Sequence, residues 1–226
     1  MTSSDPKTVM TVSGMNEIDK LTWTTRHAVA DAFERLLVLS LYLYLAWRLL
    51  FAMADGRGFV NLLLLVSEGL VVAFLLVRRP AFTISTNWID WTIALAATLC
   101  PLLVNPSDGP ALVPVEAGVL LLVMGLVIQA HAKITLGRSF GCVPAHRGLK
   151  LAGPYRFVRH PMYGGYLISH VAFLLINPTF RNAVVYTVTS VLQISRILAE
   201  ERLLSCDSDY RRYRHSVRYR MIPGIF

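Results

Sequence analysis

"MYGGYLISHVAFLLINPTFRNAVVYTVTSVLQISRIL", residues 162–198, contains two apolar segments joined by a short linker. The segments cover residues 162–176 and 183–198, and the linker begins with Asn-Pro, a typical turn dipeptide. Each segment is shorter than the roughly 20 residues that usually cross a bilayer. The stretch therefore predicts a short hairpin of two helices.

Four further apolar segments precede this hairpin, at residues 36–54, 59–77, 89–104 and 111–132. All but the third are long enough to cross a hydrocarbon core about 30 Å thick. Of the 226 residues, 54% are hydrophobic and 16% are charged, whereas soluble domains have about 25% charged residues. We therefore expect an all-α integral membrane protein with about six transmembrane helices, the last two forming the hairpin.

The basic residues predict the orientation of these helices. If both termini are cytosolic, every lysine and arginine lies on the cytosolic side except Arg48, Arg57 and Arg181. The positive-inside rule favours this arrangement. The first 20 residues lack the basic-then-apolar plan of a cleavable signal peptide. Together these features suit a bacterial inner membrane protein.

Three regions follow from this reading. Residues 1–34 form a cytosolic N-terminal tail, within which residues 23–36 fit either an interfacial amphipathic helix or an extension of the first span. Residues 35–128 hold the N-terminal transmembrane helices. Residues 129–226 include the two polar segments that are long enough to build a site, 133–161 and the tail from about 196. Both segments fall on the cytosolic side, so we expect the chemistry at that membrane boundary.

The stretch "GPYRFVRHPMYGG", residues 153–165, concentrates unusual chemistry at the start of the hairpin. Pro161 suits the first turn of a helix, and it favours an extended conformation for His160. A helix N-terminus attracts anions, and Arg159 adds a positive charge there. Gly164 permits close approach of a helix or a flat ligand. The stretch predicts either a binding site or a helix start with interfacial basic and aromatic anchors.

A second group of charges occurs in "QISRILAEERLL", residues 193–204. Arg196 and Glu200 are four residues apart and share one helix face, whereas Glu201 is turned by about 100°. Ionisable groups at the end of a membrane helix are costly unless they are paired or used. The pattern indicates either a functional group or an ion pair that marks the exit from the membrane.

The remaining patterns narrow the class of protein. The tail "YRRYRHSVRYRMIPGIF", residues 210–226, alternates arginine and tyrosine, and its position after a membrane hairpin favours anionic lipid headgroups over nucleic acid. The three cysteines have no metal-binding spacing. The sequence has no GxGxxG, P-loop, GxSxG or HExxH motif, so it gives no support to soluble Rossmann enzymes, NTPases, serine hydrolases or zinc proteases.

Five motifs in order now identify a resemblance: "LGRSFG" (136–141), "GPYRFVRHPMYGGY" (153–166), "NP" (177–178), "RILAEERLL" (196–204) and "YRRYRHSVRYRMIP" (210–223). Together they resemble the isoprenylcysteine carboxyl methyltransferase family, which is similar to phospholipid N-methyltransferases over its C-terminal half. The resemblance covers residues 129–226. It implies an integral membrane enzyme that uses S-adenosyl-L-methionine, enclosed by a cytosolic loop and the C-terminal helix.

The resemblance also implies roles for individual residues. Arg196 and Glu201 would face the methyl acceptor as catalytic residues, and no metal is implied. The isoprenylcysteine branch of the family has a histidine where this chain has Arg147, with His146 next to it. This departure bears on the prenylcysteine substrate more than on the cofactor. The cofactor-binding residues would be Leu149, Gly153, Tyr155, Arg159, His160, Pro161, Tyr163, Gly164 and Glu200.

We therefore expect S-adenosylmethionine-dependent methyl transfer to a lipophilic acceptor at the cytosolic face, by carboxyl O-methylation of an isoprenylcysteine-like substrate. A carboxylate acceptor needs orientation by an arginine, for which Arg196 is suited. The alternatives are a phospholipid amine N-methyltransferase, in which Glu201 would be the base, an NADPH-dependent sterol or steroid reductase, and a membrane scaffold or small transporter. Membrane lipids are expected partners, and nucleic acid is not.

Overall fold

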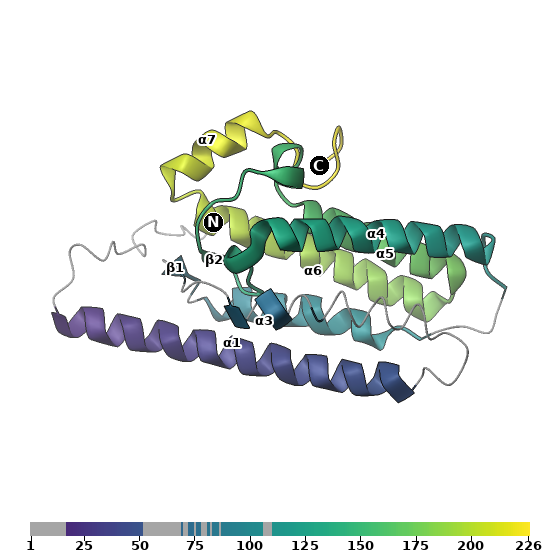
Figure 1. Cartoon of the computed structure of the whole chain (residues 1–226), viewed down its shortest axis with the longest axis horizontal. Helices are drawn as coiled ribbons and strands as arrows, with labels where there is room; N and C mark the ends of the chain where they lie inside the picture. The colour runs from purple at the N-terminus through teal and green to yellow at the C-terminus, as the bar shows by residue number, and fades with distance from the viewer. Residues whose placement is uncertain are drawn as a thin grey trace, which may run out of the picture.

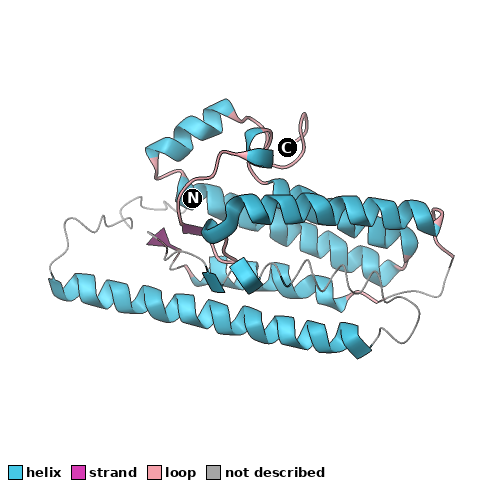
Figure 2. Cartoon of the chain, viewed as in Figure 1, coloured by secondary structure: helices cyan, strands magenta, loops and turns pink. Residues whose placement is uncertain are grey.

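The computed structural model describes residues 17–51, 69, 72–74, 76–77, 81, 83–85, 87–105 and 110–226, and these residues are mostly helical (Figure 2). Helices α3, α4, α5 and α6 form the main bundle, and α1 runs along one side of it (Figure 1). The elements are α1 (Glu17–Phe51), β1 (Thr83–Ile84), α3 (Trp88–Leu99), η4 (Cys100–Leu103), α4 (Val115–Leu136), η5 (Gly137–Ser139), β2 (Ala145–His146), η6 (Gly153–Arg156), α5 (Pro161–Ile176), α6 (Phe180–Leu204) and α7 (Ser208–Ser216).

Helix α1 is one continuous helix of 35 residues. It runs from residues 23–36 into the first predicted span without a break, and the place of residues 23–36 relative to a membrane stays a prediction. The second predicted span, residues 59–77, lies mostly outside the described residues.

Helices α4 and α5 pack closely because glycines face each other. A Cβ added to Gly165 would lie 2.8 Å from the carbonyl oxygen of Gly125 and 2.7 Å from Cγ of Gln129. Small residues at a helix interface let the two backbones approach. The buried Gln129 side chain then donates a hydrogen bond to Ser169 Oγ at 2.9 Å. This contact fixes the first turns of α5, which carry the candidate site, against α4.

The α5–α6 hairpin was predicted correctly in position but not in length. Helix α5 begins at Pro161, the residue that the sequence assigns to a first turn, and ends at Ile176 as predicted. Helix α6 has 25 residues and continues to Leu204, six residues beyond the predicted end. The apolar pattern stops at Leu198 because Glu200, Glu201 and Arg202 are charged, yet Glu201 is buried and accepts from Arg159, so the helix continues. The second arm of the hairpin is therefore not short.

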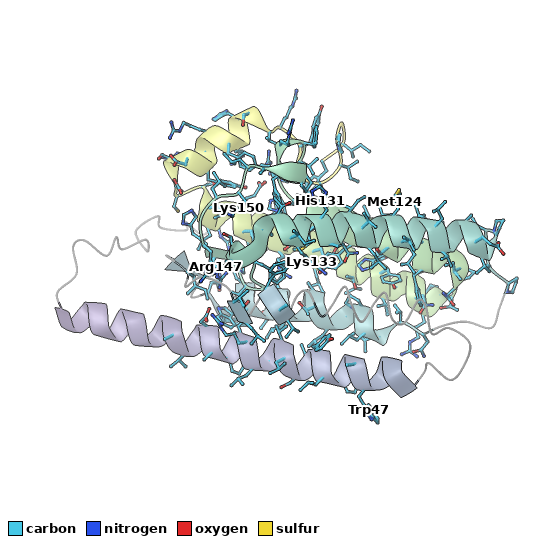
Figure 3. The ribbon with its side chains drawn as sticks, in the orientation of Figure 1. Trp47, Met124, His131, Lys133, Arg147 and Lys150 are labelled. Atoms are coloured by element: carbon cyan, nitrogen blue, oxygen red, sulfur yellow. The ribbon has the colours of Figure 1, made fainter. Side chains whose placement is uncertain are left out.

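Among the described residues, one helix, Val115–Ser139, is long and apolar enough to cross a membrane. Trp88–Leu103 and Pro161–Ile176 are apolar but shorter. The count of six transmembrane helices thus stays a prediction. Large apolar side chains also cover the outside of the molecule, and Figure 3 shows Trp47 and Met124 pointing away from the bundle.

The segments that connect α4 to α5 gather at one end of the bundle together with α7 (Figure 1). Strands β1 and β2 pair antiparallel, with Thr83 opposite His146 and Ile84 opposite Ala145. His146 Nε2 lies 3.0 Å from Asp207 Oδ2, and the Asp207 side chain caps α7 by accepting from the Asp209 amide. The α4–α5 connection and the C-terminal helix are thereby held next to each other.

Candidate functional site

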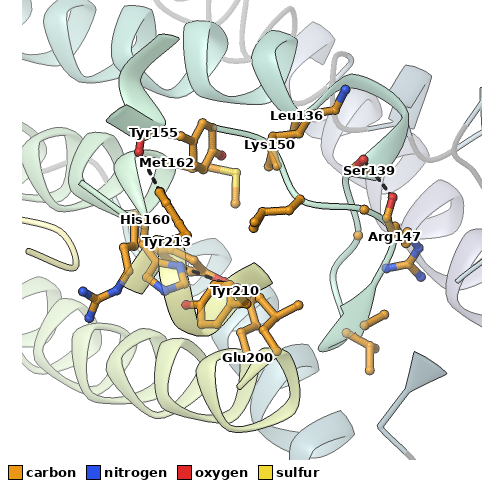
Figure 4. Close-up of a pocket in the computed structure, with 18 residues that line it drawn as sticks. Leu136, Ser139, Arg147, Lys150, Tyr155, His160, Met162, Glu200, Tyr210 and Tyr213 are labelled. Atoms are coloured by element: carbon orange, nitrogen blue, oxygen red, sulfur yellow. Dashed lines mark hydrogen bonds and ion pairs between the residues drawn. The ribbon is translucent and has the colours of Figure 1, made fainter. Parts of the chain in front are cut away.

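A pocket lies where the α4–α5 connection, the start of α5, the end of α6 and helix α7 meet (Figure 4). Six of the nine predicted cofactor-binding residues line it: Leu149, Tyr155, Arg159, His160, Tyr163 and Glu200. The other three do not line the pocket and lie at backbone positions next to it. Gly153 opens η6, Pro161 is the first residue of α5, and a Cβ added to Gly164 would lie 3.3 Å from the Met221 carbonyl oxygen.

Glu200 is the centre of the first polar cluster. Tyr163 Oη donates to Glu200 Oε1 at 2.7 Å, and Arg196 Nε donates to the same oxygen at 3.3 Å. His160 Nδ1 lies 3.7 Å from the other oxygen, Oε2. The Glu200 carboxylate is therefore oriented at the pocket wall by groups from both α5 and α6.

Arg196 lies behind this carboxylate and does not line the pocket itself. Its Nη2 donates to the Gly141 carbonyl oxygen at 3.2 Å, and its guanidinium carbon lies 5.5 Å from the centroid of the Tyr163 ring. The side chain is 7% exposed. Arg196 thus links the α4–α5 connection to the Glu200 cluster. Its predicted contact with an acceptor stays a prediction.

Glu201 belongs to a second cluster, on a different face of α6. Oε1 accepts from Arg159 Nε at 2.7 Å, and Oε2 accepts from Arg220 Nε at 2.9 Å. His160 Nε2 lies 3.4 Å from Oε1. Burial alone would raise the pKa of Glu201, but the contacts with His160, Arg159 and Arg220 outweigh it and lower the pKa to about 2. A carboxylate with so low a pKa is a poor proton acceptor, which disfavours Glu201 as a base. Its predicted place facing the methyl acceptor stays a prediction.

Arg159 holds the C-terminal segment on the start of α5. Its Nη1 donates to the carbonyl oxygens of Val217 at 2.6 Å and Arg218 at 2.8 Å, in addition to the bond from Nε to Glu201. The backbone amide of Arg159 also donates to the Tyr219 carbonyl oxygen, at 3.0 Å. Most of the guanidinium is therefore engaged within the protein. Its predicted role as an anion-binding group stays a prediction.

Two tyrosines of α7 line the pocket and were missed from the sequence. Tyr213 Oη donates to the Tyr155 carbonyl oxygen at 2.6 Å, and burial raises the pKa of Tyr213 to about 12. The Tyr210 hydroxyl is buried and has no hydrogen-bond partner among the residues that the structure describes. The two are three residues apart and so share one helix face. That spacing is the signal in the sequence for a pocket-lining face, whereas the alternation of arginine and tyrosine predicts contact with lipid headgroups.

Residues 118–206 match the isoprenylcysteine carboxyl methyltransferase (ICMT) family. Protein-S-isoprenylcysteine O-methyltransferase A of Arabidopsis thaliana is 40% identical over 68 residues, which cover 27% of this chain and 34% of the plant protein. The chain thus matches about a third of the length of that curated relative. A solved structure of the eukaryotic intramembrane Ras methyltransferase ICMT aligns over 94% of this chain and 88% of that one, with 18% identity and a TM-score of 0.46. The resemblance to this family is confirmed.

Proposed function

We propose that this protein, which carries the isoprenylcysteine carboxyl methyltransferase sequence pattern over residues 118–206, transfers a methyl group from S-adenosylmethionine to a lipophilic carboxylate. The acceptor that we propose is a prenylcysteine-like molecule. The observation that carries the proposal is the Glu200 cluster: Tyr163, Arg196 and Glu200 all lie within the matched segment, and their side chains meet at the pocket wall.

The groups that line the pocket fit the cofactor. Glu200 offers a carboxylate for an ammonium group, and the buried Tyr210 hydroxyl has no hydrogen-bond partner within the described part of the chain. Aromatic rings attract cations over their faces and stack on flat rings. Four tyrosines line the pocket: Tyr155, Tyr163, Tyr210 and Tyr213. When bound, the cofactor would supply an electrophilic methyl group on a positively charged sulfur. The protein would contribute binding, orientation and exclusion of water.

The two polar clusters favour a carboxylate acceptor over an amine. A carboxylate is already nucleophilic at neutral pH and needs no base, whereas an ammonium group must lose a proton first. The low pKa of Glu201 makes it unsuited to remove that proton. Arg196 makes its hydrogen bonds through Nε and Nη2, and we assign its Nη1 to the acceptor carboxylate. Arg196 would then join the acceptor to the residue that holds the cofactor.

A membrane location supports access for a lipophilic acceptor. Helix α4 is mostly apolar, with Glu116 in its first turn and Lys133 in its last, and large apolar side chains remain exposed on the outer faces of α4 and α6, among them Leu120, Val127, Val188 and Val191. Such a surface is typical of contact with lipid. We place the pocket at the cytosolic face, with both termini on that side of a bacterial inner membrane. The acceptor's hydrocarbon part would enter from the bilayer.

The first experiment is calorimetric titration of the purified protein in detergent with S-adenosylhomocysteine and, separately, with NADPH. We expect binding of S-adenosylhomocysteine alone. Transfer of a radiolabelled methyl group to farnesylated N-acetylcysteine should then give a base-labile ester, and phosphatidylethanolamine should stay unlabelled. Binding of NADPH alone would overturn the proposal in favour of a reductase. A base-stable label on the phospholipid would overturn the choice of acceptor.

A further inference from the structure

Glu34 of α1 makes an unusual contact with the α4–α5 connection. Its side chain is completely buried, and Oε1 accepts hydrogen bonds from the backbone amides of Cys142 at 2.6 Å and Val143 at 3.0 Å. Successive backbone amides that point to one place form an anion-binding concavity. Glu34 fills this concavity from a helix that lies outside the family match. The contact joins residues 108 and 109 positions apart in the chain.

Arg147, which lines the pocket, lies next to two acidic side chains on the same face of α1. Arg147 Nη2 lies 3.7 Å from Glu34 Oε2 and 3.8 Å from Asp31 Oδ1. Asp31 and Glu34 are three residues apart, so their side chains share one helix face. The Arg147 guanidinium packs on Gly141, where an added Cβ would collide with it. Figure 4 shows Arg147 at the edge of the pocket, with its backbone oxygen accepting from Ser139.

The segment between these contacts leads directly to the Glu200 cluster. The carbonyl oxygen of Gly141 accepts from Arg196 Nη2 at 3.2 Å, and the next amide along the chain, that of Cys142, donates to Glu34. One peptide group therefore connects α1 to α6. Gly141, Val143 and Arg147 all line the pocket, so the same contacts hold one of its walls.

We infer that Glu34, assisted by Asp31, is a positioning residue for the pocket. It holds residues 141–147 so that the Gly141 carbonyl can orient Arg196. Charge-assisted hydrogen bonds to backbone amides are strong, and replacement of Glu34 by alanine would remove such a bond from each of the two amides. The effect on catalysis rests on the proposed function, but the effect on the loop does not.

The first test measures how often the loop of residues 141–147 opens, and it needs no assay of activity. In a Cys100→Ser, Cys206→Ser background, the rate of N-ethylmaleimide labelling reports the exposure of Cys142, which is buried. We expect Glu34→Ala to raise this rate by about tenfold or more, equivalent to about 1.4 kcal/mol of lost local stability, and Glu34→Gln to raise it less. Ser40→Ala, at an exposed position of α1, is the matched control and should leave the rate unchanged. A wild-type rate for Glu34→Ala would overturn the inference.

A second reporter separates loop release from general unfolding. Cys100 contacts the Val185 carbonyl oxygen of α6, far along the chain from the loop. In a Cys142→Ala, Cys206→Ser background, Glu34→Ala should leave the labelling rate of Cys100 unchanged within about twofold, because local opening exposes only its own segment. An equal rise at Cys100 and Cys142 would mean that Glu34 supports the whole bundle, and it would refute a specific role in positioning the loop.

A double-mutant cycle tests the link to Arg196. If Glu34 acts through Arg196, Glu34→Ala and Arg196→Lys should share one defect. The double variant should then have a kcat/KM for the acceptor within about twofold of Arg196→Lys alone. Losses that multiply would refute the link. If the wild-type protein transfers no methyl group, the proposed function fails while the labelling experiments still decide the role of Glu34.

Discussion

Replacement of Glu201 by glutamine should destabilise the protein strongly, although the two side chains have nearly the same shape. The Glu201 carboxylate faces Arg159 at 2.7 Å and Arg220 at 2.9 Å, and its side chain is only 6% exposed. Glutamine removes the negative charge and turns an NH2 group toward one of the two guanidinium groups. Arg159, whose side chain is 4% exposed, then lacks its counterion, and so does the half-buried Arg220. Loss of the counterion of a buried cation is among the costliest changes in a protein interior.

Two estimates of the magnitude agree. Loss of one partner from a buried ion pair costs about 3–5 kcal/mol. The lowering of the pKa of Glu201 from 4.5 to about 2 corresponds to about 3 kcal/mol at neutral pH. For a chain of this size, about 3 kcal/mol lowers the thermal midpoint by roughly 6–12 °C.

The assay is thermal unfolding in detergent at pH 7.5, followed by intrinsic fluorescence. Arg212→Ala is the matched control, because Arg212 pairs with Asp209 at 2.6 Å but is 80% exposed, and such surface pairs contribute little. A fall of less than about 2 °C for Glu201→Gln would refute the reasoning. It would show that water or a rearranged side chain neutralises both arginines.

Four further predictions concern the same site and its supports. Because the pKa of Glu201 is lowered on folding, its contribution to stability is complete above pH 4.5 and is lost as the pH falls toward 2. The difference in thermal midpoint between wild type and Glu201→Gln should therefore shrink in that range. A difference that stays constant would contradict this. Arg196→Ala should lower turnover by about 100-fold or more while S-adenosylhomocysteine affinity falls less than about tenfold by calorimetry; equal losses would contradict its assignment to the acceptor. Gly165→Ala should lower the thermal midpoint by several degrees through overpacking against Gly125, and Gly164→Ala should lower it less, since its Cβ meets the Met221 carbonyl oxygen at 3.3 Å. Arg159→Ala should release the C-terminal segment, so that limited trypsin digestion cleaves after Arg218 and Arg220 faster than in an Arg156→Ala control; equal rates would exclude this anchoring role.

Local signals predicted the start of α5 well. Pro161 cannot donate a backbone hydrogen bond and is suited to a first turn, so the helix begins there. The separation of Glu200 from Glu201 also followed from helix geometry, since adjacent residues point about 100° apart. The structure places them in two different clusters.

Local sequence patterns could not predict which residues contact Glu200 and Glu201. Glu201 meets Arg159 and Arg220, which come from other elements, and only the fold brings them together. The apolar segment alone ends short of α6 for the same reason, because a hydropathy pattern cannot show that buried charges will be neutralised; the helical spacing of Arg196 and Glu200 is what extends the helix to these charges. Glu34 was missed because its partners are backbone amides, which have no residue type to recognise.

The contact between α1 and the α4–α5 connection limits how this protein can be recombined. A chimera that joined residues 118–226 to an unrelated membrane anchor would keep every motif of the family, together with the Glu200 and Glu201 clusters. It would nevertheless present the amides of Cys142 and Val143 to a foreign helix with no acceptor at the position of Glu34. Exchange between relatives should therefore succeed only when the donor of the first helix also brings an acid at this position. The N-terminal helix and the segment that matches the family have to be exchanged together.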